Sequence, residues 1–254
     1  MDITNIARAL TPLVVAVCLA PVPEASAQVS GASAQMSRIG LVSPRPLTGA
    51  KACAAAEVNE GDAWRTLLAA RQMDDDGARR VLAELHDSLT LEVRARPGDV
   101  SLRYLTGVVA GSRADVEGGR SAIAFAQEMA RHVEAILEIE PDHAGAHHLL
   151  GRLHAAVLRM DGFTRFVATR LLGGGELAGA SWEEARMRLE LAVAGAPCVP
   201  DHHYELARLY AERGEVRPAV ARLHDLLSLA DPEGPYADVH RKGRTLLARL
   251  EGRS

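Results

Sequence analysis

Histidine is the residue type in this chain with the clearest chemical potential, and four of its ten histidines lie close together in sequence. His143 and His147 are four residues apart, and His147 and His154 are seven apart, so all three fall on one side of a helix. His148 follows directly. Zinc needs three or four ligands of this type that converge on one point. The spacing therefore opens a metal-handling hypothesis built on His143, His147 and His148.

A repeated pattern of helix ends surrounds these histidines. Proline cannot continue a helix, and an aspartate that follows it can cap the next one. Three segments share this feature: Arg96–Asp99, Glu140–His143 and Ala196–Asp201. Ten residues after their first prolines come small residues, as two closely crossing helices require: Gly107, Gly151 and Ala207. The residues just before these form the main apolar contact position: Thr106, Leu150 and Leu206.

These units match the tetratricopeptide repeat. The clearest one runs from Pro200 to Leu229, and the period agrees with the known length of roughly 34 residues. In the unit that contains Gly151, the second helix begins late, at Trp182, after an insertion of 22 residues. The sequence therefore predicts an all-α fold: a tetratricopeptide-repeat solenoid of antiparallel helix pairs, with one insertion and a C-terminal capping helix over Tyr236–Leu250.

The repeat register gives the histidines a structural explanation as well. His147 and His203 occupy the same slot, and His154 corresponds to Tyr210 of the next unit, so these rings can be core fillers. No glutamate stands between them as in a His-Glu-x-x-His zinc site. We therefore predict no metal ligands and keep the metal-handling role as the alternative.

Other chemical motifs are incomplete. Gly173–Gly175 lacks the Gly-Lys-Ser/Thr ending of a phosphate-binding loop, and Asp74–Gly77 lacks the closing glutamate of a calcium loop. The aspartates are better interpreted as caps of the following helix. The sequence contains no Gly-x-Ser-x-Gly nucleophile motif. We predict a protein that is not an enzyme and uses no cofactor.

The first residues predict export. Arg8, an apolar run from Leu10 to Ala20 and an Ala-x-Ala site form a signal peptide over residues 1–27, cleaved after Ala27. Residues 28–58, rich in Ser, Ala, Gly and Pro, are expected to be a disordered tether before a repeat domain over 59–254. The chain would then be periplasmic or secreted. There Cys53 and Cys198 could form a disulfide, or remain two thiols.

Residues 147–194 resemble the regulator of microtubule dynamics family. The features are a Leu-Leu-Gly-Arg helix at 149–152, an insertion with aromatic and basic residues, and Trp-Glu-Glu-Ala at 182–185. The layout extends over residues 62–250. The resemblance implies a helical scaffold. Its microtubule association is not expected to carry over to an exported chain.

A binding groove is predicted from the same register. Stacked repeats expose two positions of each first helix on the concave face: here Tyr104, His148 and Tyr204, and then Val108, Arg152 and Arg208. A ring precedes Arg152 and Arg208 by four residues in each case. We expect an extended peptide whose carboxylates bind Arg152 and Arg208. In the alternative, these arginines pair with Glu205 or Glu212 and only solvate the surface.

The insertion is a second candidate contact. Phe163, Val167 and Leu171 recur every four residues, beside basic side chains: Arg159, Arg165 and Arg170. This pattern is typical of a short basic amphipathic helix that binds a partner groove or an acidic membrane surface. In the alternative, its apolar side folds onto the repeats. The formal net charge of −4, without a basic stretch, excludes nucleic acid as the main partner. The expected function is a non-catalytic protein- or peptide-binding scaffold in the cell envelope, with no membrane contact.

Overall fold

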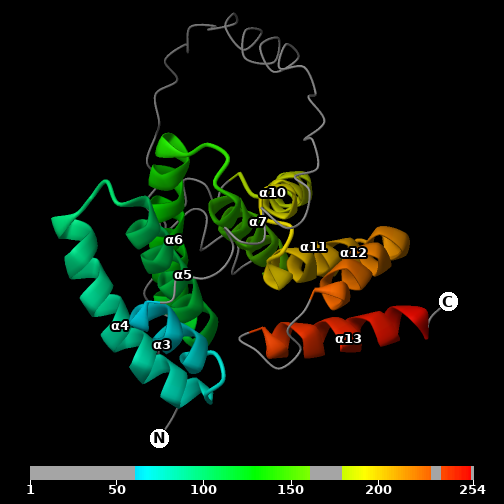
Figure 1. Ribbon diagram of the computed structural model, residues 1–254, viewed down its shortest axis with the longest axis horizontal. Helices are drawn as coiled ribbons and strands as arrows, with labels where there is room; N and C mark the ends of the chain where they lie inside the picture. Colours follow the sequence, from blue (N-terminus) through cyan, green and yellow to red (C-terminus); the bar gives the residue numbers. More distant parts are fainter. Residues whose placement is uncertain (1–60, 161–178, 230–235, 253–254) are drawn as a thin grey trace, which may run out of the picture. The chain divides into compact units, whose positions relative to one another are not determined.

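The computed structural model describes residues 61–160, 179–229 and 236–252, all within one compact unit, Pro46–Ser254 (Figure 1). Every regular element in these ranges is an α-helix, which confirms the predicted all-α class. None of the helices described there is long and apolar enough to cross a membrane. The predicted signal peptide, tether and insertion lie outside the described residues, and so do Phe163, Arg165, Val167 and Arg170.

The described helices are α3 (Asp62–Ala70), α4 (Asp75–Ala95), α5 (Val100–Val116), α6 (Gly119–Ile139), α7 (Ala144–Arg159), α10 (Trp182–Gly195), α11 (Pro200–Glu212), α12 (Val216–Ser228) and α13 (Ala237–Glu251). Each packs on the next along the chain, including α7 on α10 across the insertion, and α13 also packs on α11 (Figure 1). The predicted closing helix is therefore present as α13.

The predicted helix ends at the three prolines are confirmed, whereas two of the three predicted aspartate caps are not: the N-cap residue of α7 is His143 and that of α11 is Val199. Helices α4, α6 and α10 end just before Pro97, Pro141 and Pro197. The Asp99 carboxylate caps α5 by accepting the Leu102 N–H at 2.9 Å. At α7 the cap is not Asp142 but His143, whose Nδ1 accepts the Ala146 N–H at 3.1 Å. At α11, Pro200 occupies the first turn after Val199, where its missing N–H costs no hydrogen bond.

Gly151, one of the small residues of the repeat register, lies at a close helix contact. A Cβ atom on Gly151 would stand 2.6 Å from Leu189 Cγ and 3.1 Å from the Ala185 carbonyl oxygen, so α7 and α10 touch almost backbone to backbone. Ala207 is fully buried. The apolar contact residues Thr106, Leu150 and Leu206 are buried too.

Three apolar clusters form the core along the described chain. The largest joins α3 to α7 around Leu67, Val109 and Ile136. A second lies around Leu189 and Leu209 and links α7, α10 and α11. The third joins α11, α12 and α13 through residues that include Ala207, Leu223, Leu246 and Leu250. In the loop between α10 and α11, Cys198 is disulfide-bonded, and its predicted partner Cys53 lies outside the described residues.

Candidate functional site

The five residues predicted to form a groove come from three helices, of which α7 packs against the other two. Tyr104 belongs to α5, His148 and Arg152 to α7, and Tyr204 and Arg208 to α11. The two arginines come together, whereas the rings take up separate positions.

Arg152 and Arg208 share one carboxylate. Glu205, which is buried, lies 3.6 Å from Arg152 Nε and 3.8 Å from an Arg208 guanidinium nitrogen. Each arginine also has a shorter bond to a more exposed acid: Arg152 donates to Asp115 at 3.0 Å, and Arg208 Nε to Glu212 at 3.0 Å. The predicted alternative, pairing with Glu205 or Glu212, therefore describes both arginines in this structure.

Burial lowers the pKa of the Arg152 guanidinium, but Glu205 and Asp115 raise it more, so the net shift is upward. Arg152 is therefore a permanent cation. A third arginine, Arg159 of α7, also belongs to this group, because its guanidinium binds both oxygens of Glu212 at 2.8 to 3.0 Å.

These three arginines line a cavity of about 260 Å³, which we call the arginine cavity. Its other walls are Asp115 and apolar or small residues of α5, α6 and α7: Gly111, Ala114, Ala126, Met129, Leu153 and Ala156. The cavity thus combines an apolar floor with cations from two helices. Such an arrangement can hold a short chain segment by its apolar part and its carboxylates.

Neither tyrosine lines the arginine cavity. Tyr104 packs against Trp64 of α3 and His143, with ring centroids 5.9 and 4.9 Å away. Burial is the main cause of an upward shift in its pKa. Tyr204 packs against the third apolar cluster, near α12 and α13. Both rings therefore act as packing groups between helices.

His148 is also a packing group. It is buried, and its ring stacks on His202 of α11 with centroids 4.7 Å apart. Burial lowers the pKa of His148 well below its usual range, and burial lowers that of His202 to about 4. His202 Nδ1 lies 3.1 Å from the Ala192 carbonyl oxygen and donates its proton there. Both rings are neutral at pH 7.

The histidines of the metal-handling alternative do not converge. His143 caps α7, His148 stacks on His202, and the two ring nitrogens of His147 face the Pro141 carbonyl at 2.9 Å and Arg188 at 3.2 Å. Among the described residues, no group of three His, Cys, Asp or Glu side chains is arranged to hold a metal ion.

A long-range ion pair lies close to this site. Arg71, just after α3, donates to Asp201 of α11 at 3.1 Å. Asp201 is the main cause of an upward shift in the pKa of Arg71. Tyr236, just before α13, lies near both, although burial is the larger cause of its raised pKa. This charged contact therefore joins helices that are far apart in sequence.

The sequence interpretation missed Arg159 and Asp115 as members of the site. Each lies seven residues after a predicted groove position, Arg152 and Val108 respectively, and therefore two turns further along the same helix face. A search at that spacing would have found them. No comparable pattern predicts Arg71 and Asp201, which are 130 residues apart.

These features define an all-α protein of successively packed helices, with an arginine-lined cavity on α5, α6, α7 and α11. The chain belongs to the Regulator of microtubule dynamics protein 1-3 family, whose model matches residues 62–251. This confirms the resemblance based on residues 147–194. A comparison with curated proteins finds no match.

Proposed function

We propose that this chain is a non-catalytic tetratricopeptide-repeat scaffold of the cell envelope that binds an extended protein or peptide segment at the arginine cavity. The observation that carries the proposal is the convergence of Arg152, Arg159 and Arg208 over an apolar floor of about 260 Å³. Arginine is the side chain best suited to planar, bidentate recognition of carboxylates. The segment that binds would accordingly be acidic, with small or apolar residues between its acids.

The existing ion pairs hold the arginines in place without blocking a ligand. Asp115 is 60% exposed and Glu212 32% exposed, and pairs of this kind contribute only about 0–1 kcal/mol each in water. A carboxylate of the partner can therefore exchange with either acid. Because the guanidinium groups are already ordered, binding costs less side-chain entropy than it would for free arginines.

Several observations support the repeat and export parts of the proposal. The repeat assignment is supported by the three units in register and by the close contact at Gly151. Export is supported by the signal-peptide pattern over residues 1–27 and by the disulfide-bonded state of Cys198. The family name refers to microtubules. We propose that an exported member keeps the helical scaffold without that partner.

The test combines capture with direct binding. The mature chain, from Gln28 onward, is used to capture proteins from a cell-envelope extract, and acidic peptides from the captured proteins are titrated against it. We expect Arg152→Ala plus Arg208→Ala to weaken binding by about tenfold or more, since charge-assisted hydrogen bonds are worth about 1.5–3 kcal/mol. The matched control is Arg241→Ala plus Arg249→Ala on α13, which should leave binding unchanged.

A second variant separates loss of the site from loss of the fold. Ala156 is exposed and lines the cavity, so Ala156→Trp fills the space and leaves every arginine pair intact. We expect it to block the peptide without lowering the melting temperature. Unchanged binding by both variants would refute the proposal. Stoichiometric zinc or copper in the purified chain would favour the metal-handling alternative instead.

A further inference from the structure

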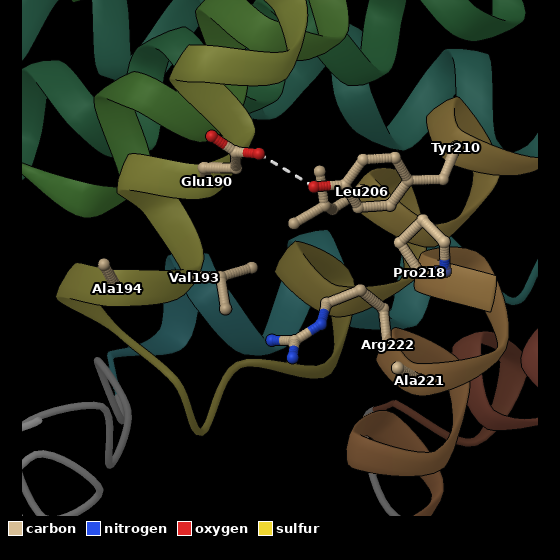
Figure 2. A pocket seen from close by; sticks show the side chains of 8 residues that line it. All are labelled: Glu190, Val193, Ala194, Leu206, Tyr210, Pro218, Ala221 and Arg222. Carbon is tan, nitrogen blue, oxygen red and sulfur yellow. Dashed lines mark hydrogen bonds between the residues drawn. The ribbon is translucent and has the colours of Figure 1, made fainter. Parts of the chain in front are cut away.

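A second concave surface lies between α10 and α12, away from the arginine cavity. Both helices pack on α11, which forms its floor (Figure 2). The space between them is about 400 Å³, and we call it the α10–α12 groove. Its lining residues are Glu190, Val193 and Ala194 of α10, Leu206 and Tyr210 of α11, and Pro218, Ala221 and Arg222 of α12. It shares no lining residue with the arginine cavity.

The walls of the groove are mainly apolar. Val193 and Leu206 form the inner surface, and Pro218 closes the side toward α12 (Figure 2). The apolar surface continues along α10, where Met187 and Leu191 are 41% and 43% exposed. These two residues and Ala194 recur at helical spacing, so they form one stripe on α10. A ligand that fills the groove can therefore bury an apolar side chain and extend along this stripe.

The two charged residues that line the groove, Glu190 and Arg222, differ in their partners. On the α10 side, one Glu190 oxygen accepts hydrogen bonds from Tyr210 Oη at 2.8 Å and from Arg186 at 3.1 Å. On the other side, Figure 2 shows the Arg222 side chain extending from α12 toward α10. Arg222 pairs at 2.9 Å with Asp225, a neighbour on its own helix, and the two side chains are 34% and 46% exposed. The negative charge is thus well compensated, whereas the Arg222 guanidinium pairs with a surface aspartate.

We propose that the α10–α12 groove binds the C-terminal end of a partner polypeptide whose last residue is apolar. The terminal side chain would lie against Val193, Leu206 and Pro218, and the terminal carboxylate would bind Arg222. A guanidinium can bind both oxygens of a free carboxylate through two parallel hydrogen bonds. Its pair with Asp225, an exposed neighbour on the same helix, is weaker than that. Charge complementarity selects a free carboxylate, and the apolar walls select the side chain next to it.

This site goes beyond the peptide site proposed at the arginine cavity. The two ligands differ, because one is an internal acidic segment and the other is an apolar chain end. The two sites can therefore be tested separately on the same preparation, and failure at one leaves the other standing.

The probe is a pool of fluorescein-labelled hexapeptides with mixed internal residues and Leu, Ile, Val or Phe at the end. A second pool has the same sequences with amidated C-termini. Fluorescence anisotropy measures the affinity of each pool for the mature chain. We expect the free acids to bind about tenfold or more tightly than the amides, the size expected for a charge-assisted hydrogen bond. Binding should also weaken as the salt concentration rises.

Three variants locate the binding. Arg222→Gln should lower the affinity for the free-acid peptides to that for the amides. Arg222→Lys should restore part of the difference in affinity. Ala194→Trp, at an exposed lining position, should block both pools by filling the groove. The matched control is Ala248→Trp at an exposed position of α13. Circular dichroism melting checks that each variant folds.

Two results would overturn the proposal. The first is equal affinity for acids and amides, or no binding by either pool to a folded chain. The second is full binding by Arg222→Gln or by Ala194→Trp. If Arg152→Ala plus Arg208→Ala abolishes binding of the free-acid pool while Arg222→Gln does not, the chain ends bind at the arginine cavity and the groove is not their site.

Discussion

At the scale of single residues, five histidines of the described part of the chain are packing groups. His147, His148, His154, His202 and His203 are all buried. His203 repeats the arrangement of His147: its Nε2 lies 2.6 Å from the Pro197 carbonyl, as that of His147 does from the Pro141 carbonyl. The shared repeat slot therefore explains the spacing that first indicated a metal site. In these two units a ring with one hydrogen bond to a turn carbonyl fills the place where the helix pair begins.

Buried neutral histidines make the folded state sensitive to acid. The pKa of His202 falls from its ordinary value of 6.5 to about 4 because the ring is buried. The unfolded chain therefore binds a proton between pH 6.5 and 4 that the folded chain does not, so stability falls as the pH drops through that window. Above pH 6.5 this residue contributes no pH dependence.

We predict that His202→Phe reduces this sensitivity. The ring still packs on His148, and the hydrogen bond to the Ala192 carbonyl is lost, at a cost of about 1 kcal/mol at pH 7. The loss of stability between pH 7 and pH 5 should shrink by about 2 kcal/mol, as the linkage relation requires. Urea unfolding at both pH values measures it. His224→Phe, at an exposed position of α12, is the control, and equal pH responses in the two variants would contradict the prediction.

At the scale of helices, the small-residue slot differs from unit to unit. Gly107 and Gly151 occupy equivalent positions in the sequence, but their surroundings differ. A Cβ on Gly107 would lie 3.4 Å from His132 Cβ, an ordinary contact, whereas on Gly151 it would lie 2.6 Å from Leu189 Cγ. The crossing of α7 and α10 is therefore the tighter one, and it is also the crossing that spans the insertion.

We predict opposite outcomes for the two glycines. Gly151→Ala should destabilise the protein by about 1–3 kcal/mol, because the Ala185 carbonyl, 3.1 Å from the new Cβ, cannot move aside as a side chain can. Gly107→Ala should leave stability unchanged or raise it by up to about 1 kcal/mol, since alanine is the better helix former. Thermal unfolding of both variants checks this. A Gly151→Ala protein as stable as Gly107→Ala would show that α7 and α10 are less closely packed.

The register of the helices could be predicted from the sequence, and their side-chain partners could not. Proline ends a helix through its effect on the local backbone. The helix ends near Pro97, Pro141 and Pro197 can therefore be predicted from the residues themselves. Which acid meets Arg152 depends on how three helices stack. The sequence predicts Glu205 and Glu212 as possible partners, but not Asp115, which lies on α5. The rings of the predicted groove show the same limit: His148 is buried, and Tyr104 and Tyr204 pack against other helices.

At the scale of the whole described unit, one contact joins segments that no repeat rule connects. Helices packed in succession touch mainly their neighbours, so stability in such an array is largely a sum of local terms. The Arg71–Asp201 ion pair departs from this, because it joins the end of the first described helix, α3, to α11. Its side chains are 33% and 22% exposed, which is less than for most surface ion pairs of the chain. We infer that it couples the first described helix to α11.

A double-mutant cycle tests this coupling. Urea unfolding is measured for Arg71→Ala, for Asp201→Ala and for the double variant. We expect a coupling energy of about 1 kcal/mol. This is at the upper end of the range for exposed pairs, because these side chains are partly shielded from water. The matched control is Arg241 with Asp238 within α13, where the side chains are 70% and 35% exposed and the coupling should be close to zero. Hydrogen exchange gives a second readout: amides of α3 should exchange faster in Arg71→Ala, while those of α12 should not change. Equal coupling in the two pairs, with unchanged exchange in α3, would mean that the array is stabilised by neighbouring contacts alone.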